Sequence, residues 1–141
     1  MLFRSLARHR FIQATQAREL LQTQPRELKV ALLEAYQGPW MCMGDFNYVI
    51  SEDEASEGRK GCSSATNYLK ELMFEFGAID LGFSGSKFTW AKGRWGNASI
   101  KRRLDRGIAN MSWRLAYPGA TIVHLGAINS DHAPILLDTN P

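Results

Sequence analysis

The sequence predicts a mixed α/β fold from three observations. Apolar residues near the start recur at helical spacing, short apolar runs bounded by turn residues follow, and a β-branched segment alternates near the end. The 141 residues are 45% hydrophobic and 22% charged, which is typical of one globular domain. We expect two helices, a strand, a helix, two strands, a helix and two strands, in that order.

The first two predicted helices occupy residues 3–22 and a segment that begins at Pro25 and ends at Gly38-Pro39. The first is amphipathic, rich in arginine and poor in acids, as organellar transit peptides are. A surface helix packed on the domain explains the same pattern. We therefore separate residues 1–24, a targeting-like segment or a surface helix, from a domain over 25–141.

Two further helices are expected in the domain. One runs over 65–76, is capped by Ser64 and ends at Gly77. A shorter one begins at Asn110 or Ser112 and ends at Pro118-Gly119. The buried stripe of the longer helix is predicted to be Tyr68, Leu69, Leu72, Met73 and Phe76.

The strands are short and separated by polar turns. Residues 51–63 are predicted to form a polar surface loop, and residues 82–86 a Gly/Ser turn. The expected strands are 40–46, 88–90, 99–108, 121–125 and 133–137.

The charge pattern favours an acidic partner. The net charge is +3, and basic residues gather in 92–106 with Trp90 and Trp95 among them. Cations neutralise phosphates and aromatic rings stack on bases, so we expect a nucleic-acid groove. A solvated hairpin is the other interpretation. The cluster comprises Lys92, Arg94, Lys101, Arg102, Arg103 and Arg106.

The two cysteines, Cys42 and Cys62, have neither the spacing of a zinc site nor the density of a disulfide scaffold. An intracellular, reducing compartment is the default expectation. No run of 18 apolar residues occurs, so we expect no membrane partner.

Asp45 lies in Gly44-Asp45-Phe46-Asn47, at the predicted carboxyl end of the strand 40–46. A carboxylate there is suited to act as a general base or to hold a cation, and Asn47 is placed to donate to a phosphate oxygen. Taken alone, the motif is more typical of an ordinary turn.

His132 follows Asp131 within Ser130-Asp131-His132-Ala133-Pro134-Ile135. An imidazole beside a phosphate needs a carboxylate to fix its tautomer, and adjacent residues on a strand point to opposite faces. We therefore expect Asp131 to face a metal or water, and a distant acid, Asp105, to orient His132. Ordinary turn and strand roles remain open, as does an ion pair from Asp105 to Arg103 or Arg106.

Two further residues are less specific. Asp80 is predicted either to support the site or to cap the turn that follows it. His124, on an alternating strand, is predicted to be structural.

Four ordered motifs resemble the endonuclease/exonuclease/phosphatase superfamily. They are Gly44-Asp45-Phe46-Asn47, Ile79-Asp80-Leu81-Gly82-Phe83 with Phe88-Thr89-Trp90, Arg103-Leu104-Asp105-Arg106, and Ser130-Asp131-His132-Ala133-Pro134-Ile135. The likeness is greatest to the apurinic-type endonuclease domain of plant LINE-type (non-LTR) retrotransposons. It covers about residues 25–138.

The resemblance implies roles for these residues. Asp45 would activate water, Asn47 would contact the scissile phosphate, Asp105 would orient His132, and His132 would stabilise the transition state. Asp131 would assist Mg²⁺ binding. Thr89 and Trp90 would lie at the rim facing DNA, beside Arg102 and Arg103. The implied reaction is Mg²⁺-dependent nicking of DNA that leaves a 3′-hydroxyl able to prime reverse transcription.

The resemblance also implies a fold. The family is a four-layer α/β sandwich of two halves, and every match lies in the C-terminal half. We thus expect one mixed, mainly antiparallel sheet with helices on one side, plus N-terminal helices. The inner sheet face would be covered by helix 3–22, by self-association or by a partner chain.

The first half of the family fold should provide an early Asn and a metal-binding Glu in a Gln-Glu-Thr-like strand end, a pattern that this sequence does not contain. We therefore expect a domain fragment that is inactive or weak alone. The alternatives are a competent phosphodiesterase or phosphatase using Asp45, Asp131 and His132, and a non-catalytic nucleic-acid-binding module. Family resemblance implies a nuclear location.

Overall fold

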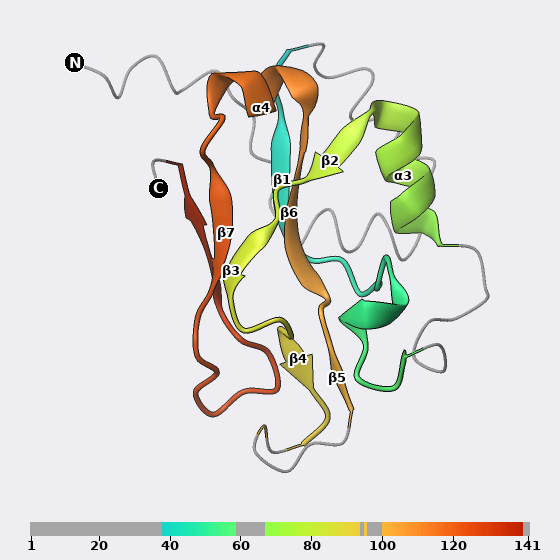
Figure 1. Ribbon diagram of the computed structural model, residues 1–141, viewed down its shortest axis with the longest axis vertical. Coiled ribbons are helices and arrows are strands. Elements are labelled where there is room, and N and C mark those ends of the chain that lie inside the picture. Colours follow the sequence, from blue (N-terminus) through green and yellow to red (C-terminus); the bar gives the residue numbers. More distant parts are fainter. Residues whose placement is uncertain (1–37, 59–66, 94, 96–99, 140–141) are drawn as a thin grey trace.

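The computed structural model describes residues 38–58, 67–93, 95 and 100–139 (Figure 1). The helices predicted over 3–22 and from Pro25, the cap Ser64, and Cys62 lie outside these residues. The described part contains both helices and strands, which confirms the α/β class. The elements are β1 (Met41–Asp45), η3 (Glu52–Glu54), α3 (Tyr68–Phe76), β2 (Ala78–Asp80), β3 (Phe83–Gly85), β4 (Trp90–Ala91), β5 (Lys101–Arg102), β6 (Asp105–Asn110), α4 (Met111–Ala116), β7 (Thr121–His124) and β8 (Ile135–Asp138).

The central sheet has the order β1-β6-β2, and all its pairings are antiparallel. Successive residues of a strand point to opposite faces, and both faces of this sheet are buried. Cys42 and its partner Ile108 pack with α3, whereas Met41 and its partner Ala109 pack with Trp113 of α4 and with β7. The sheet is therefore the middle layer of the described fold.

Helix α3 agrees with its predicted end and with most of its predicted buried stripe, but it begins at Tyr68 rather than at residue 65, because the side chain of Asn67 accepts the backbone N–H of Lys70 and caps it. Gly77 follows it with φ 58°, the left-handed conformation that commonly ends a helix. Leu69 and Leu72 are buried, but Tyr68 is exposed because it lies at the first turn, where its ring meets the edge of Tyr48. Tyr68 is therefore a correction to the predicted stripe.

Of the two predicted starts of helix α4, Asn110 and Ser112, the structure shows the first. The side chain of Asn110 accepts a hydrogen bond from the backbone N–H of Trp113 at 3.0 Å, which identifies Asn110 as the N-cap. Trp113 is buried against β6 and β7. Among the described residues, no helix has the length and apolar character needed to cross a membrane.

A second sheet has the order β3-β7-β8. Strand β3 occupies most of the segment predicted to be a Gly/Ser turn, because it pairs in parallel with β7, far along the chain. Gly85 allows this pairing: its φ is 92°, and a Cβ there would lie 2.5 Å from the carbonyl oxygen of His124.

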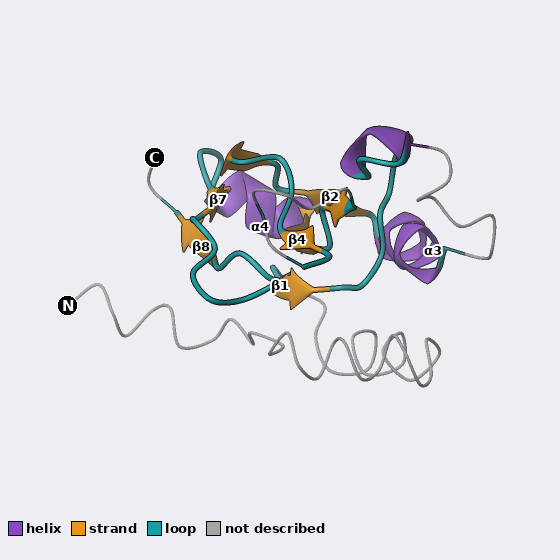
Figure 2. Ribbon diagram, turned by 90° about the horizontal axis from the view of Figure 1, so that it is seen from below, coloured by secondary structure: helices purple, strands orange, loops and turns teal. Residues whose placement is uncertain are grey.

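The prediction of one sheet with helices on one side is therefore wrong for the described residues. Three separate sheets are present, and α3 and α4 pack on opposite faces of the central one (Figure 2). The two helices lie on opposite faces because each covers a different set of alternating side chains on β1 and β6.

The third sheet is the two-stranded pair β4-β5. The strand predicted over 99–108 is interrupted, since β5 ends at Arg102 and β6 begins at Asp105. The backbone N–H groups of Leu104 and Asp105 donate to the Thr89 hydroxyl at 3.0 and 2.9 Å. This interruption places Asp105 at the first position of β6, where the candidate site begins.

Candidate active site

His132 lies between two carboxylates. Its Nδ1 is 3.0 Å from Oδ2 of Asp105, and its Nε2 is 3.9 Å from Oδ2 of Asp45. The two acids are register partners across β1 and β6, so the sheet itself sets their separation. His132 is 34% exposed in its side chain, whereas both carboxylates are more deeply buried. The imidazole is thus the part of this cluster that an external molecule reaches most readily.

Backbone contacts deliver His132 to this position. His132 forms an isolated antiparallel bridge with Trp90, and the N–H of Ala133 donates to the carbonyl oxygen of Thr89 at 2.7 Å. The N–H of Ala91 donates to the carbonyl oxygen of Asp131 at 3.0 Å. The segment before β8 therefore runs beside β4, which brings His132 over the start of β6.

Asp131 points elsewhere, as adjacent residues on an extended segment do. Its Oδ2 accepts a hydrogen bond from the indole Nε1–H of Trp90 at 3.3 Å. Among the described residues, one group has possible metal-ligand atoms within 4.8 Å of one another: Asp45, Asp105 and His132. Asp131 is exposed and does not belong to this group. Its predicted metal role stays a prediction.

Burial and neighbouring groups together set the pKa of Asp105. Burial raises the pKa of Asp105, hydrogen bonds from His132 and Thr89 lower it, and the nearby charge of Asp45 raises it again, with a net rise. The structure therefore places beside His132 an acid whose ionised form depends on hydrogen bonds. This is the Asp105–His132 contact expected from the sequence, and neither Arg103 nor Arg106 takes the place of His132.

The Asp45 motif forms a tight local turn. Oδ1 of Asp45 accepts the backbone N–H of Asn47 at 2.8 Å, and Asn47 has φ 60°, a conformation in which asparagine is enriched. The Asn47 side chain is exposed. The turn thus fixes one carboxylate oxygen and leaves Oδ2 directed toward His132; phosphate contact by Asn47 stays a prediction.

Thr89 and Trp90, which were predicted to lie near a DNA-facing rim, have different environments. Thr89 is fully buried, because its hydroxyl is occupied by the backbone of Leu104 and Asp105, so the prediction that it faces DNA is wrong. Trp90 is half-buried, and its indole N–H binds Asp131.

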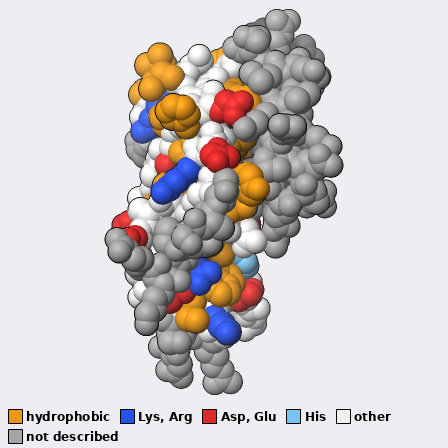
Figure 3. Space-filling view, turned by 90° about the vertical axis from the view of Figure 1, so that its right-hand side faces the viewer, with side chains coloured by type: hydrophobic (Ala, Val, Ile, Leu, Met, Phe, Trp, Pro, Cys, Tyr) orange, Lys and Arg blue, Asp and Glu red, His pale blue; other side chains and the backbone are white. Residues whose placement is uncertain are grey.

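Two arginines of the predicted basic groove are engaged by acids within the fold. Arg103 is buried and pairs with Glu54 and Asp80, each at 2.9 Å, so its guanidinium does not face a nucleic acid. Arg102 pairs with Glu57 at 2.6 Å and lies over the ring of Trp90. Among the coloured side chains of Figure 3, basic and acidic groups are interspersed rather than gathered in one basic stripe.

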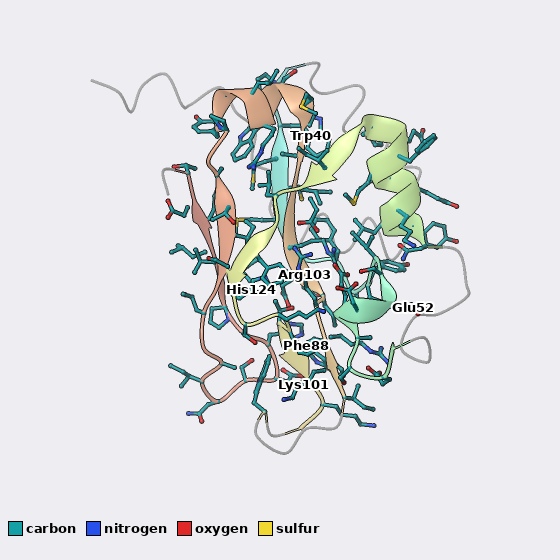
Figure 4. All side chains as sticks on the ribbon, viewed as in Figure 1. Trp40, Glu52, Phe88, Lys101, Arg103 and His124 are labelled. Atoms are coloured by element: carbon teal, nitrogen blue, oxygen red, sulfur yellow. The ribbon has the colours of Figure 1, made fainter. Side chains whose placement is uncertain are left out.

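A buried ion-pair network explains these arginines. Arg106, which is fully buried, pairs with Glu54 at 2.7 Å and with Asp80 at 3.0 Å, and Arg103 binds the same two acids. Arg103 lies in the middle of the fold, above Phe88 and Lys101 in the view of Figure 4. Asp80 also accepts the N–H of Gly82, so it both supports the arginines and caps the turn.

Sequence reasoning missed Glu54, which it placed in a polar surface loop. Glu54 is buried, and its Oε2 accepts the backbone N–H of Ile50 at 2.7 Å. Burial raises the pKa of Glu54, but the hydrogen bonds and charges of Arg106 and Arg103 outweigh burial and hold that pKa below its usual value. The same balance lowers the pKa of Asp80. The only signal in the sequence was the density of charge around the β6 motif.

His124 has the structural role predicted for it. Its Nδ1 contacts the carbonyl oxygen of Ser86, and its ring stacks on Phe83 with centroids 4.6 Å apart. Burial lowers the pKa of His124, so the ring is disposed to be neutral.

Comparison of the sequence with models of known protein families finds no match, and comparison with curated proteins finds none either.

Proposed function

We propose that this chain carries part of the site of a Mg²⁺-dependent DNA endonuclease of the endonuclease/exonuclease/phosphatase type, similar to that of plant LINE-type retrotransposons. The observation that supports it best is His132 held between Asp105 and Asp45. In this proposal the described residues belong to the C-terminal half of a four-layer sandwich.

His132 would act on the phosphate through Nε2. A carboxylate acceptor at Nδ1 favours the tautomer that carries its proton there, and it stabilises the imidazolium when Nε2 is protonated. Nε2 then donates to a phosphate oxygen on which negative charge develops. The partial exposure of the ring gives a substrate access to this nitrogen.

Asp45 would prepare the attacking water. Its Oδ1 is held by the N–H of Asn47, while Oδ2 lies toward His132. A carboxylate beside the phosphate is suited to accept a proton from the attacking water. Base and acid would therefore act on the same phosphate from neighbouring positions.

The residues present fit Mg²⁺ in part. Mg²⁺ is usually bound by one or two carboxylates with water and substrate phosphate, and Asp45 offers a carboxylate beside the site while Asp131 offers one that is exposed. Asp105 is less suited, because its carboxylate already binds His132 and Thr89. When bound, Mg²⁺ would polarise the phosphate and offset developing charge.

We expect the chain alone to be a weak enzyme, because its sequence contains no Gln-Glu-Thr-like metal motif. The alternative of a purely nucleic-acid-binding module draws less support, since Arg102 and Arg103 are engaged by acids within the fold.

Nicking of supercoiled plasmid tests the proposal. We expect slow conversion to the open circle with Mg²⁺, none with EDTA, and conversion at least tenfold slower with His132→Ala. Nicking at the parental rate in His132→Ala, or nicking that survives EDTA, would reject it. Leu115→Ala, an exposed apolar position on α4, is the matched surface control and should nick at the parental rate.

A further inference from the structure

Thr89 lies where three segments meet. Its backbone N–H donates to the carbonyl oxygen of Arg102 at 3.0 Å, and its carbonyl oxygen accepts the N–H of Ala133 at 2.7 Å. Its hydroxyl accepts the N–H groups of Leu104 and Asp105. One buried residue thus joins the start of β6 to the segment that carries His132.

Every hydrogen-bonding position of the Thr89 hydroxyl is used. A hydroxyl offers one proton and two lone pairs, and the two amides occupy both lone pairs. The proton remains for the Asp105 carboxylate, with which the Thr89 side chain forms a hydrogen bond. Because all three positions are used, the hydroxyl has one orientation.

We propose that Thr89 is a positioning residue for His132. Its hydroxyl holds the backbone N–H of Asp105, which keeps the carboxylate of that residue in place to accept the Nδ1–H of the imidazole and leaves Nε2 directed toward Asp45. Thr89 is fully buried, so its side chain is not exposed to a substrate. Its effect on nicking depends on the proposed function, whereas its effect on the His132 tautomer does not.

Three variants isolate the hydroxyl. Thr89→Val keeps the shape of the side chain and the backbone bonds to Arg102 and Ala133, but it removes every hydroxyl contact. Thr89→Ser restores the hydroxyl without the methyl group. Thr121→Val, on β7, makes the same chemical change at a half-buried position outside the site.

The readout is the tautomer of His132, obtained from long-range ¹H–¹⁵N NMR spectra as a function of pH. We expect the Nδ1–H form in the parent, in Thr89→Ser and in Thr121→Val, and a shift toward the Nε2–H form in Thr89→Val. Unchanged His132 nitrogen shifts in a folded Thr89→Val would overturn the proposal. If Thr89→Val does not fold, Thr89→Cys replaces it, and an unshifted tautomer there has the same consequence.

Nicking rates separate this inference from the proposed function. In an active parent, Thr89→Val should lower the rate by about tenfold, the lower range for loss of a residue that supports a functional histidine, and Thr89→Ser should restore it. A parent that never nicks DNA contradicts the proposed function but leaves the tautomer result intact. A parental rate in Thr89→Val, with a shifted tautomer, contradicts the positioning role in catalysis.

Discussion

Asp45 and Asp105 stand directly opposite each other in the antiparallel pairing of β1 and β6, and His132 lies against both. Like charges at opposed positions of a sheet repel, and an imidazole that binds one of them and approaches the other reduces that repulsion. The cluster is thus one electrostatic unit, in which a change at any member alters the others.

The first prediction follows from this coupling. Asp45→Asn removes a charge that raises the pKa of Asp105, while an amide oxygen still accepts the N–H of Asn47. We expect the pKa of Asp105 to fall in this variant, measured by carboxyl ¹³C NMR titration. Asp138→Asn, at the far end of β8, should leave it unchanged. An equal or higher Asp105 pKa in Asp45→Asn would show that the two acids are not coupled.

The second prediction concerns acid stability. Glu54 and Asp80 have pKa values lowered in the fold, so their stabilisation is complete above the unfolded-state pKa and is lost as pH falls through the folded-state value. Glu54→Gln leaves buried Arg106 and Arg103 without one partner, which typically costs about 3–5 kcal/mol. Urea unfolding should show this loss of unfolding free energy at pH 7 and a smaller loss in strong acid.

Glu71→Gln is the control for the ion-pair network, since Glu71 is exposed on α3. We expect it to change stability little at either pH, as is usual for surface charges. A Glu54→Gln deficit that is the same at pH 7 and in strong acid would point to packing rather than charge.

The third prediction concerns Cys42. Burial between β1 and α3 raises the pKa of this thiol to about 12, so almost no thiolate is present at neutral pH. In a Cys62→Ser background, a disulfide reagent should modify native Cys42 slowly, at a rate that rises with urea. Rapid labelling of the native protein at pH 8 would contradict this burial.

The elements that the sequence predicted correctly depend on local signals. Strand β1 is an apolar run before a turn, α3 ends at a glycine, and α4 has an asparagine cap. Strand β3 carries no such signal, because a Gly/Ser segment becomes a strand only when β7 pairs with it from far along the chain. The β-propensity of a segment does not predict which distant strand will pair with it.

The candidate site shows the same contrast between local sequence signals and contacts with distant residues. Asp45, Asp105 and His132 were identified from motifs, and the structure brings them together. The partners of Arg103 could not be assigned, since Glu54 is 49 residues away in the sequence and resembles an ordinary loop acid. Thr89 was misplaced for a related reason: the two amides that occupy its hydroxyl become available only where β5 and β6 separate.

The most direct test of the central claim is single-turnover cleavage of an end-labelled DNA duplex by excess protein with Mg²⁺. The account predicts slow cleavage that leaves an extendable 3′-hydroxyl, at least tenfold slower in both Asp45→Ala and His132→Ala, since general acid–base groups contribute about 10²–10⁴-fold. Cleavage at equal rates in the parent and both variants, or no cleavage by the parent, would contradict it.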